Sequence, residues 1–379
     1  MSTETLYDCA IVGGGLGGLC LSIQLAQNGF KVILFEKETY PFHKVCGEYI
    51  SLESKQFLSS CGIYIDELQL PIIKKLQISA PSGYAIQAAL PLGGFGISRF
   101  TLDQLLVNEA TKLGVTVMQG TKVSQVKNND LLYEIHAENL VYNSRIVAGS
   151  YGKRSNIDIQ LKRNFIAKKY KDAENYIGIK YHIKLDYPID LISLHNFKDG
   201  YCGISKVDDD RYCLCYLTNS KNLKENGSSI QEMEKNVMMK NPYLKEIFDS
   251  AEFLYKEPLS ISQIHFEEKE QVVNGIFMVG DAAGIITPLC GNGMSMAMHA
   301  SKIFARLATI FLDGKMSKEQ LEIAYTKAWR KEFAKRVWFG RQFQKLFGDP
   351  KITEFVFRIL KWNPSLLKVI IKLTHGKEF

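Results

Sequence analysis

The sequence predicts an α/β fold in which a nucleotide-binding domain is interleaved with an antiparallel β-sheet domain and followed by a helical C-terminal segment. Three observations carry this prediction. A glycine-rich turn at residues 13–18 joins an apolar strand to a helix. The region after residue 160 changes to long alternating strands, and a second glycine-acid turn follows at residues 280–284. The 379 residues suffice for two packed domains and an accessory segment.

The predicted domains alternate along the chain. We expect the nucleotide domain over residues 1–75, 99–158 and 270–312, the sheet domain over residues 76–98 and 159–269, and a helical basic segment over residues 313–379. The clearest predicted elements are a βαβ unit over residues 6–36, a helix at 101–113, strands at 176–185, 191–197, 201–206 and 211–218, and a long helix at 293–312.

Composition and charge exclude several classes of protein. Hydrophobic residues make up 46% and charged residues 23% of the chain, as in an ordinary globular protein. The net charge of +7 is concentrated in the C-terminal segment, and no motif beyond this charge indicates nucleic-acid binding. Eight cysteines occur without a Cys-x-x-Cys pair, so we expect thiols and no metal site. No secretion signal or membrane-length apolar stretch is visible, so we expect a cytoplasmic protein.

The turn Gly13-x-Gly15-x-x-Gly18 is the strongest motif, because a strand precedes it and a helix follows it, as in a Rossmann dinucleotide site. Gly13 permits the tight turn, Gly15 lets a diphosphate approach the backbone, and Gly18 lets the helix pack closely on the strand. Glu36 ends the next strand, where it can accept hydrogen bonds from ribose hydroxyls and disfavours a 2′-phosphate. The alternative is an ordinary glycine-rich turn.

Several further motifs extend this pattern over most of the chain. They are KVCGE at 44–48, SRFTLDQLL at 98–106, GSYGKRS at 149–155 and VGDAAGIITPLCGNGMSMAM at 279–298. Together with GGGLGG and Glu36, they resemble the geranylgeranyl reductase-like branch of the para-hydroxybenzoate hydroxylase superfamily, the group A flavoprotein monooxygenases. The resemblance implies an FAD cofactor on a nucleotide domain of this superfamily's type.

The resemblance also implies roles for individual residues. Asp281 would bind the FAD ribityl chain, Arg99 would lie by the flavin, and the turn with Pro288, Gly291 and Gly293 would aim a helix N-terminus at the flavin pyrimidine edge. A strand-end turn with an N-capping Asp281 is the alternative. The residues expected to contact the cofactor are Gly13, Gly15, Leu16, Gly18, Glu36, Lys37, Lys44, Cys46, Arg99, Val123, Gly280, Asp281, Pro288, Gly291, Gly293 and Met294.

Electron supply stays open. The family's DG motif has an aspartate where this sequence has Tyr151, and we find no second glycine fingerprint between a strand and a helix. In several relatives the DG segment helps to bind the nicotinamide donor. Two donors are therefore considered: NAD(P)H that binds transiently, or a reduced partner protein such as a flavoprotein or ferredoxin.

Three side chains near the expected flavin are candidates for chemistry. Cys46 is the candidate catalytic residue, because the KVCGE cysteine tunes the flavin or substrate binding in some reductases of this branch. Cys290 falls in the second flavin loop, and His43 is a candidate proton donor. The alternatives are a small packing residue for each cysteine and a solvated loop histidine.

Two apolar surfaces suggest a hydrophobic substrate. Strand 176–185 alternates Tyr181 and Ile183 with Lys180 and His182, so its apolar face would either roof a substrate pocket or pack under helices. The C-terminal stretch FVFRILKWNPSLLKVIIKL mixes apolar residues with Arg358, Lys361, Lys368 and Lys372. It would either touch an anionic membrane peripherally or form the basic outer face of a packed helix.

The predicted function is FAD-dependent oxidoreduction of a hydrophobic prenyl, lipid, aromatic or polyketide substrate, with hydride delivered from reduced flavin to a C=C bond. The alternative reaction is hydroxylation of an aromatic ring through a C4a-hydroperoxyflavin. Halogenation ranks third, because the Trp-x-Trp-x-Ile-Pro element of flavin halogenases is missing from the sequence. A prenyl-binding escort protein without redox chemistry is the alternative from another class.

Overall fold

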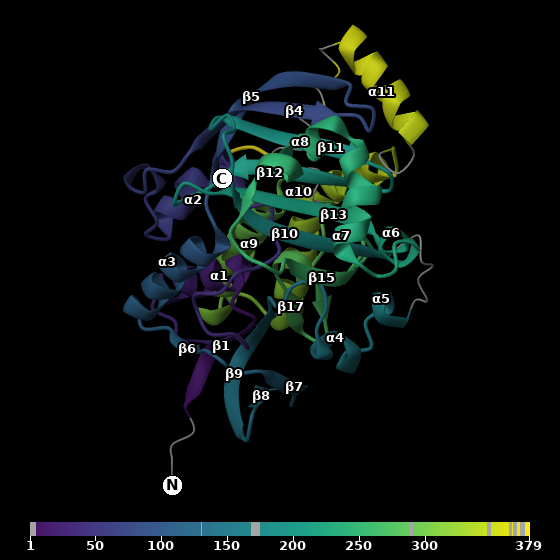
Figure 1. The fold of residues 1–379 in the computed structure, drawn as a ribbon. Helices are drawn as coiled ribbons and strands as arrows, with labels where there is room; N and C mark the ends of the chain where they lie inside the picture. The colour runs from purple at the N-terminus through teal and green to yellow at the C-terminus, as the bar shows by residue number, and fades with distance from the viewer. Residues whose placement is uncertain are drawn as a thin grey trace.

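A computed structural model describes residues 5–129, 131–167, 175–287, 291–346, 350–363, 366, 370–371 and 376–379. These residues form two β-sheets, one above the other in Figure 1, with helices packed around both. The lower sheet belongs to the predicted nucleotide domain and the upper one to the predicted sheet domain. The predicted fold class is confirmed.

The lower sheet has eight strands, and its central order is β17-β9-β1-β2-β6. Its strands are β1 (Leu6–Val12), β2 (Val32–Phe35), β6 (Thr116–Met118), β7 (Val123–Asn128), β8 (Tyr133–Ala137), β9 (Leu140–Gly149), β16 (Val272–Val273) and β17 (Ile276–Met278). The five central strands run parallel, so their carboxyl ends and the loops that follow them share one edge. The predicted contact residues Gly13, Glu36 and Gly280 all follow these strand ends.

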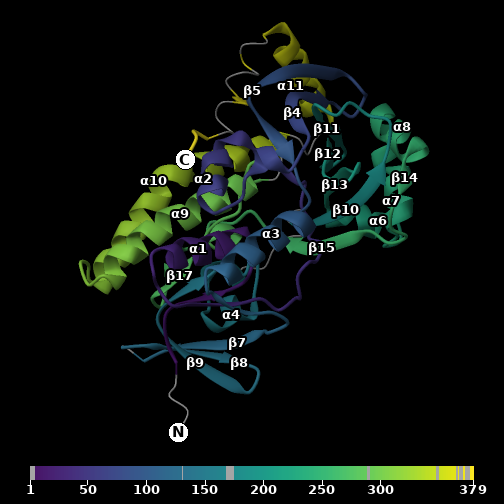
Figure 2. The same cartoon turned by 90° about the vertical axis from the view of Figure 1, so that its left-hand side faces the viewer.

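Helix α1 (Leu16–Gln27) completes the predicted βαβ unit between β1 and β2. It is covered by α3 (Arg99–Lys112) and α9 (Gly293–Leu312), whose bounds agree closely with the predicted helices. Helix α10 (Lys318–Leu346) packs on α9, and the Tyr325 hydroxyl donates a hydrogen bond to the carbonyl of Met278 at 2.6 Å. Figure 2 shows α9 and α10 side by side along the nucleotide domain.

The upper sheet has nine strands in the order β14-β10-β13-β12-β11-β4-β5-β3, with β15 paired to β10. They are β3 (Tyr49–Ser51), β4 (Ile72–Ser79), β5 (Ala85–Gly96), β10 (Tyr176–Lys184), β11 (Leu191–Phe197), β12 (Gly200–Lys206), β13 (Tyr212–Asn219), β14 (Glu252–Phe253) and β15 (Leu259–Ile264). All pairs are antiparallel except β4 with β11, which run parallel. β3 was not expected, since it lies in a segment assigned to the nucleotide domain.

Both the apolar and the polar face of β10 are buried. Ile179 and Tyr181 pack with side chains of α7 (Ile230–Asn236) and α8 (Pro242–Ser250), so the packing alternative holds for the apolar face. Lys180 and His182 on the other face are buried against the loop that contains Lys44. Strand alternation therefore separated the apolar face from the polar face correctly but could not show that both are buried.

The remaining elements are short, apart from α11 (Pro350–Trp362), which has 13 residues. The short ones are α2 (Lys55–Ser60), α4 (Asn156–Gln160), α5 (Asn164–Ala167), α6 (Ser220–Glu225) and the 3-10 turns η1 (Leu52–Ser54), η2 (Ile65–Glu67), η4 (Met238–Lys240) and η5 (Gly280–Ala282). Helix α11 lies at the far edge of the upper sheet, beside β5 (Figure 1). Among the described residues, no helix has the length and apolarity needed to cross a membrane.

Replacing Gly18 with alanine should destabilise the protein, because a Cβ at this position would overlap the carbonyl oxygen of Gly13. We expect the free energy of unfolding, measured by urea denaturation, to fall by about 2 kcal/mol. Gly47→Ala is the matched control, since no atom lies within 4 Å of a Cβ added there. Equal stability of the two variants would contradict the proposed close packing.

Candidate active site

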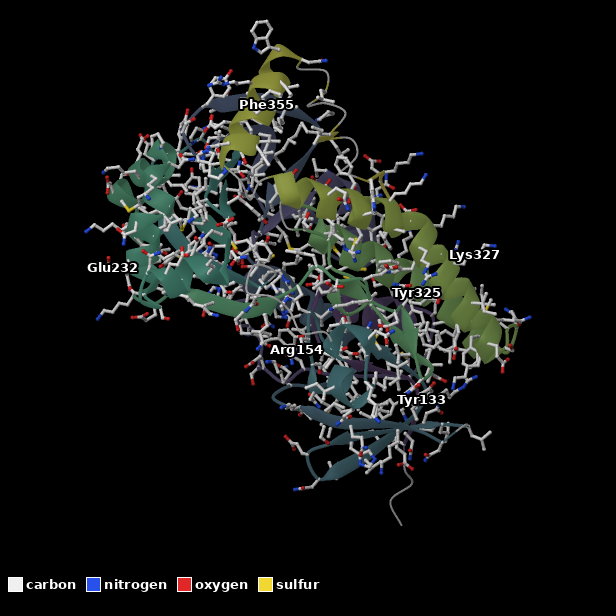
Figure 3. All side chains as sticks on the ribbon, turned by 90° about the vertical axis from the view of Figure 1, so that its right-hand side faces the viewer. Tyr133, Arg154, Glu232, Tyr325, Lys327 and Phe355 are labelled. Atoms are coloured by element: carbon white, nitrogen blue, oxygen red, sulfur yellow. The ribbon has the colours of Figure 1, made fainter. Side chains whose placement is uncertain are left out.

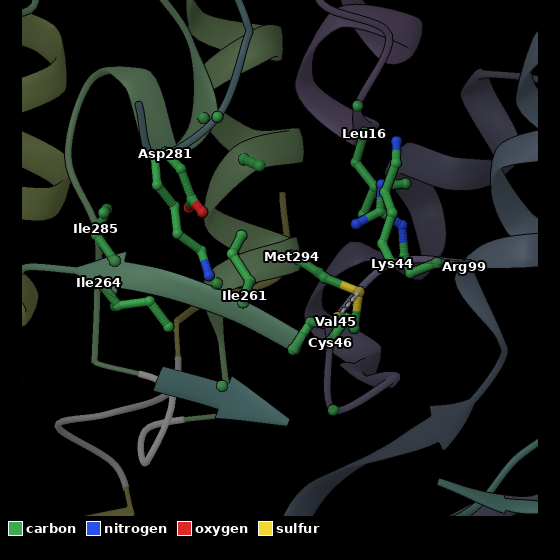
Figure 4. Close-up of a pocket in the computed structure, with 18 of the residues that line it drawn as sticks. Leu16, Lys44, Val45, Cys46, Arg99, Ile261, Ile264, Asp281, Ile285 and Met294 are labelled. Carbon is green, nitrogen blue, oxygen red and sulfur yellow. Dashed lines mark hydrogen bonds between the residues drawn. The ribbon is translucent and has the colours of Figure 1, made fainter. Parts of the chain in front are cut away.

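A cavity of about 1240 Å³ lies between the carboxyl edge of the lower sheet and the upper sheet. Of the residues predicted to contact the cofactor, all but two line this cavity. Gly18 does not line it and instead lets α1 pack on β1, and Pro288 lies outside the described residues, as does Cys290. Figure 4 shows Leu16, Lys44 and Arg99 on one side, Asp281 and Ile285 on the other, and Met294 with Cys46 between them.

The N-terminus of α1 has the properties that an anionic diphosphate needs. Gly13 has a φ of 108°, which an L side chain rarely adopts. A Cβ added to Gly15 would find its nearest neighbour, the Ser150 carbonyl oxygen, only at 3.9 Å, so this position faces open space. Gly15 caps α1 without a side-chain hydrogen bond, and the first turn contains no acid. Unpaired N–H groups and the helix dipole therefore favour an anion here.

Glu36 holds this turn in shape from the end of β2. Its Oε2 accepts a hydrogen bond from the Gly14 amide at 3.0 Å, and its Oε1 accepts one from the Glu38 amide at 3.1 Å. A carboxylate in this position has lone pairs left for ribose hydroxyls. Val123 is buried beside it at the start of β7, whereas Lys37 is exposed at the cavity rim.

Arg99 and Lys44 share one fully buried carboxylate, that of Asp103. The Arg99 guanidinium donates two hydrogen bonds of 2.8 Å to Asp103, and Lys44 Nζ lies 2.9 Å from its Oδ2. Burial alone would raise the pKa of Asp103, but the two cations outweigh burial and hold its pKa below the ordinary value. Arg99, Lys44 and Asp103 together carry one net positive charge, which the Glu36 carboxylate balances beside the α1 N-terminus.

A second helix N-terminus enters the cavity from α9. Asn292 is its N-cap residue, no acid lies in its first turn, and Gly291 has a φ of 63°. Gly280 and Asp281 of η5 form the adjacent wall, and the Asp281 carbonyl accepts a hydrogen bond from Lys269 Nζ at 2.9 Å. This arrangement fits an elongated anionic cofactor that reaches from α1 to α9.

Glu48 organises the loop between the two sheets, and sequence analysis did not single it out. Its Oε1 accepts hydrogen bonds from Lys180 Nζ at 2.5 Å and from the Arg99 amide at 2.7 Å. Its Oε2 lies 2.6 Å from His182 Nε2. The signal that could have revealed this cluster was the pair of ionisable residues spaced two apart on a strand that is otherwise apolar.

The charge on Glu48 is stabilised by these partners. Burial alone would raise the pKa of the Glu48 carboxyl, but the His182 hydrogen bond and the Lys180 ammonium lower the pKa below its ordinary value. Glu48, His182 and Cys213 place potential metal-ligand atoms within 4.8 Å of one another. A cation would have to displace the buried Lys180 ammonium from the carboxylate, so this cluster fits an internal ion pair better than a metal site.

Cys46 and His43 both line the cavity, on the loop that Glu48 holds. The Cys46 thiol lies 3.5 Å from the sulfur of Met294 in the first turn of α9. His43 Nε2 lies 3.1 Å from the Tyr255 hydroxyl, and its Nδ1 is buried without a hydrogen-bond partner among the described residues. Burial, Lys180 and His182 together lower the pKa of His43 below its ordinary value, which favours the neutral imidazole.

The end of the cavity away from the nucleotide turn is apolar. It is lined by aliphatic and aromatic side chains from the upper sheet and the C-terminal segment, namely Leu76, Ile78, Leu90, Ile192, Leu194, Tyr201, Leu217, Ile261, Ile264, Ile370 and Ile371. Such a surface binds a hydrocarbon chain or ring by excluding water from it.

Tyr151, which replaces the family's aspartate, also lines the cavity. Its hydroxyl lies 3.1 Å from Oδ1 of Asp158, a fully buried carboxylate in α4 that also forms an ion pair of 2.9 Å with Arg163. The Asp158 carboxylate, seven residues further along the chain, is thus connected through the Tyr151 hydroxyl to the position where the family has an aspartate.

Replacing Glu48 with glutamine should leave the Lys180 ammonium buried without its counter-charge. We expect the free energy of unfolding at neutral pH to fall by about 3 kcal/mol, as when one partner of a buried ion pair is removed. Because folding lowers the pKa of Glu48, its contribution is present above the ordinary carboxyl range and lost as the pH falls through the lowered pKa. The stability of the Glu48→Gln variant should therefore depend less on pH in acid.

The double variant Glu48→Gln, Lys180→Met is the control, since it removes both charges. Denaturation curves should show that it recovers part of the lost stability. Additive losses in the double variant would contradict the ion pair.

Relatives of known name support the resemblance seen in the sequence. A digeranylgeranylglycerophospholipid reductase of Methanocaldococcus jannaschii is 24% identical over 399 aligned residues, which cover 96% of this chain and 97% of that protein. Conditioned medium factor receptor 1 of Dictyostelium discoideum is 25% identical over 365 aligned residues, which cover 87% of this chain and 68% of that protein. The predicted resemblance to the geranylgeranyl reductase-like branch is confirmed.

Solved structures share the whole fold. The flavin-dependent brominase Bmp2 superposes with a TM-score of 0.80 at 18% identity, covering 98% of this chain and 93% of the brominase. A geranylgeranyl bacteriochlorophyll reductase-like protein of Thermoplasma acidophilum superposes with a TM-score of 0.76 at 18% identity, covering 94% and 91% of the two chains. At these identities the likeness establishes the fold alone.

A family model described as FAD binding domain matches residues 6–338, which span both sheets and most of α10. The match covers the glycine turn, the Arg99 helix and the Asp281 turn that line one cavity. The chain therefore belongs to this FAD-binding family and is an FAD-dependent oxidoreductase.

Proposed function

We propose that the protein uses FAD to reduce a carbon–carbon double bond in a prenyl chain or a similarly hydrophobic substrate. The observation that carries this proposal is the continuity of one cavity from the uncapped N-terminus of α1 to an apolar end lined by residues such as Leu76, Leu194 and Leu217. A charged dinucleotide and a hydrocarbon can occupy opposite ends of such a site. The named reductases among the relatives support the same class of reaction.

The residues at the polar end fit the parts of FAD in order. We propose that the α1 N-terminus receives the diphosphate, Glu36 the adenosine ribose and Asp281 the ribityl chain, with the α9 N-terminus near the flavin ring. When bound and reduced, FAD supplies a hydride to one carbon of the double bond. NAD(P)H or a reduced partner protein remains the proposed electron donor.

The loop around Cys46 and His43 is proposed to supply the second hydrogen as a proton. In this proposal the neutral His43 releases a proton from Nδ1 to the other carbon and takes one at Nε2 from the Tyr255 hydroxyl. The partly exposed Tyr255 regains its proton from water. Hydride plus proton complete the reduction, and the apolar lining keeps water from the reacting carbons.

The substitution Gly15→Val should weaken flavin binding without disturbing the fold, because the position faces open space. We expect the affinity for FAD, measured by flavin fluorescence titration, to fall by about 100-fold, as expected for a lost diphosphate contact. Leu194→Ala at the apolar end is the matched control and should keep the flavin. A colourless wild-type protein that cannot be reconstituted would favour the escort alternative.

A single-turnover experiment distinguishes reduction of the substrate from its oxygenation or halogenation. The flavin is reduced with dithionite under nitrogen and mixed with a geranylgeranyl lipid. We expect flavin reoxidation and a product heavier by two hydrogens per reduced bond, with slower reoxidation in Leu194→Ala because the hydrocarbon loses contacts. Substrate-dependent oxygen consumption, with an oxygen or halogen atom in the product, would overturn the reductase proposal.

His43→Phe should slow the same turnover by about 100-fold, as for the loss of a general acid, and leave FAD binding unchanged. The phenyl ring keeps the stacking on Phe100, whose ring centroid lies 4.7 Å from that of His43. Cys46→Ala is the comparison, and we expect a smaller loss of rate because the thiol contacts Met294. A full rate in His43→Phe together with a large loss in Cys46→Ala would reassign the proton to the thiol.

A further inference from the structure

Helix α11 has two apolar faces. Phe357 and Leu360 on the inner face are buried in the apolar cluster around β4 and β5. The outer face presents large apolar side chains spaced three or four residues apart, and they are all exposed: Phe355, Ile359 and Trp362, followed by Leu366. Phe355 is 65% and Trp362 is 90% exposed. This outer stripe needs a partner that the described part of the chain does not supply.

The outer stripe lies next to the apolar end of the cavity. The cluster that holds Phe357 and Leu360 also contains Leu76, Leu90 and Ile371, which line the cavity. Helix α11 therefore lies between this cluster and the exposed stripe. Figure 3 shows α11 projecting from the body of the molecule, with Phe355 on it and the labelled residues of α10 well away.

The charge around the stripe is positive. Residues 350–362, which form α11, contain three lysines and arginines and one glutamate. Lys351 and Arg358 are exposed on α11 itself. Lys368 and Lys372, which were expected either to face a membrane or to lie on the basic outer face of a packed helix, lie outside the described residues. Apolar side chains with basic neighbours are typical of helices that lie on anionic membranes.

We propose that α11 docks on an anionic lipid bilayer, with its outer stripe inserted at the level of the headgroups. The helix has 13 residues, too few to span a bilayer, so it would lie in the plane of the surface. Two copies joined through this stripe would bring like basic charges together, which disfavours a dimer. Docking through the outer stripe would place the apolar end of the cavity beside the hydrocarbon layer of the bilayer. The relevance of this placement to the reaction rests on the proposed function.

Vesicle binding of the FAD-loaded full-length chain tests the docking directly. Flotation with phosphatidylcholine vesicles that contain increasing phosphatidylglycerol should give binding that rises with anionic lipid and falls with salt. The double variant Phe355→Ser, Trp362→Ser should lower the partition coefficient by about 100-fold, roughly tenfold for each apolar side chain withdrawn from the interface.

The matched control is Leu131→Ser, Ile323→Ser, which removes two exposed apolar side chains elsewhere, 89% and 68% exposed. It should bind vesicles like the wild type. Absence of wild-type binding, equal loss in the control, or a dimer in light scattering that the α11 variant abolishes would each overturn the proposal.

A water-soluble geranylgeranyl diphosphate separates this inference from the proposed function. Its reduction should be the same in the wild type and the α11 double variant, since neither replaced residue lines the cavity. Failure to reduce it in both proteins would count against the proposed reaction and leave vesicle binding as an independent result. Loss of its reduction in the α11 variant alone would show that the stripe serves the cavity and contradict a purely docking role.

Discussion

The buried carboxylate of Glu48 joins the two sheets, and the site between them depends on it. A carboxylate removed from water has to be compensated by partners, and here they come from β10 of the upper sheet and from the first residue of α3 in the nucleotide domain. These three contacts link β10 of the upper sheet to the start of α3 in the nucleotide domain. They also hold the loop whose side chains, Lys44 and Cys46, form one wall of the cavity.

The electrostatics of the cavity favour a negatively charged group at one end and an uncharged group at the other. Two helices begin at the cavity without an acid in the first turn, and Arg99 with Lys44 exceeds the charge of Asp103. Such fixed dipoles and charges need no rearrangement when an anion arrives. At the apolar end, in contrast, a charged group would lose its hydration without gaining a partner. The difference in polarity therefore distinguishes the cofactor end from the substrate end, in addition to their shapes.

Local signals made much of the fold predictable from the sequence. The turn from Gly13 to Gly18 and the helix over 293–312 depend on glycine geometry and helical periodicity, both visible over a few residues. The strand β3 was missed because it has only three residues and pairs with β5, which lies more than 40 residues further along the chain. The burial of Lys180 and His182 was missed because strand alternation separates two faces without showing that both are covered.

The cavity is built from residues far apart in the chain, as Leu16 and Ile371 illustrate. A ribosome synthesises residue 16 long before residue 371, and the nucleotide domain itself is complete only after β17 and α9 have been made. The lining of the cavity is therefore complete only when translation is nearly finished. Tight binding of the cofactor then requires the last part of the chain to be synthesised. Truncated or stalled chains would therefore bind flavin weakly even with an intact glycine turn.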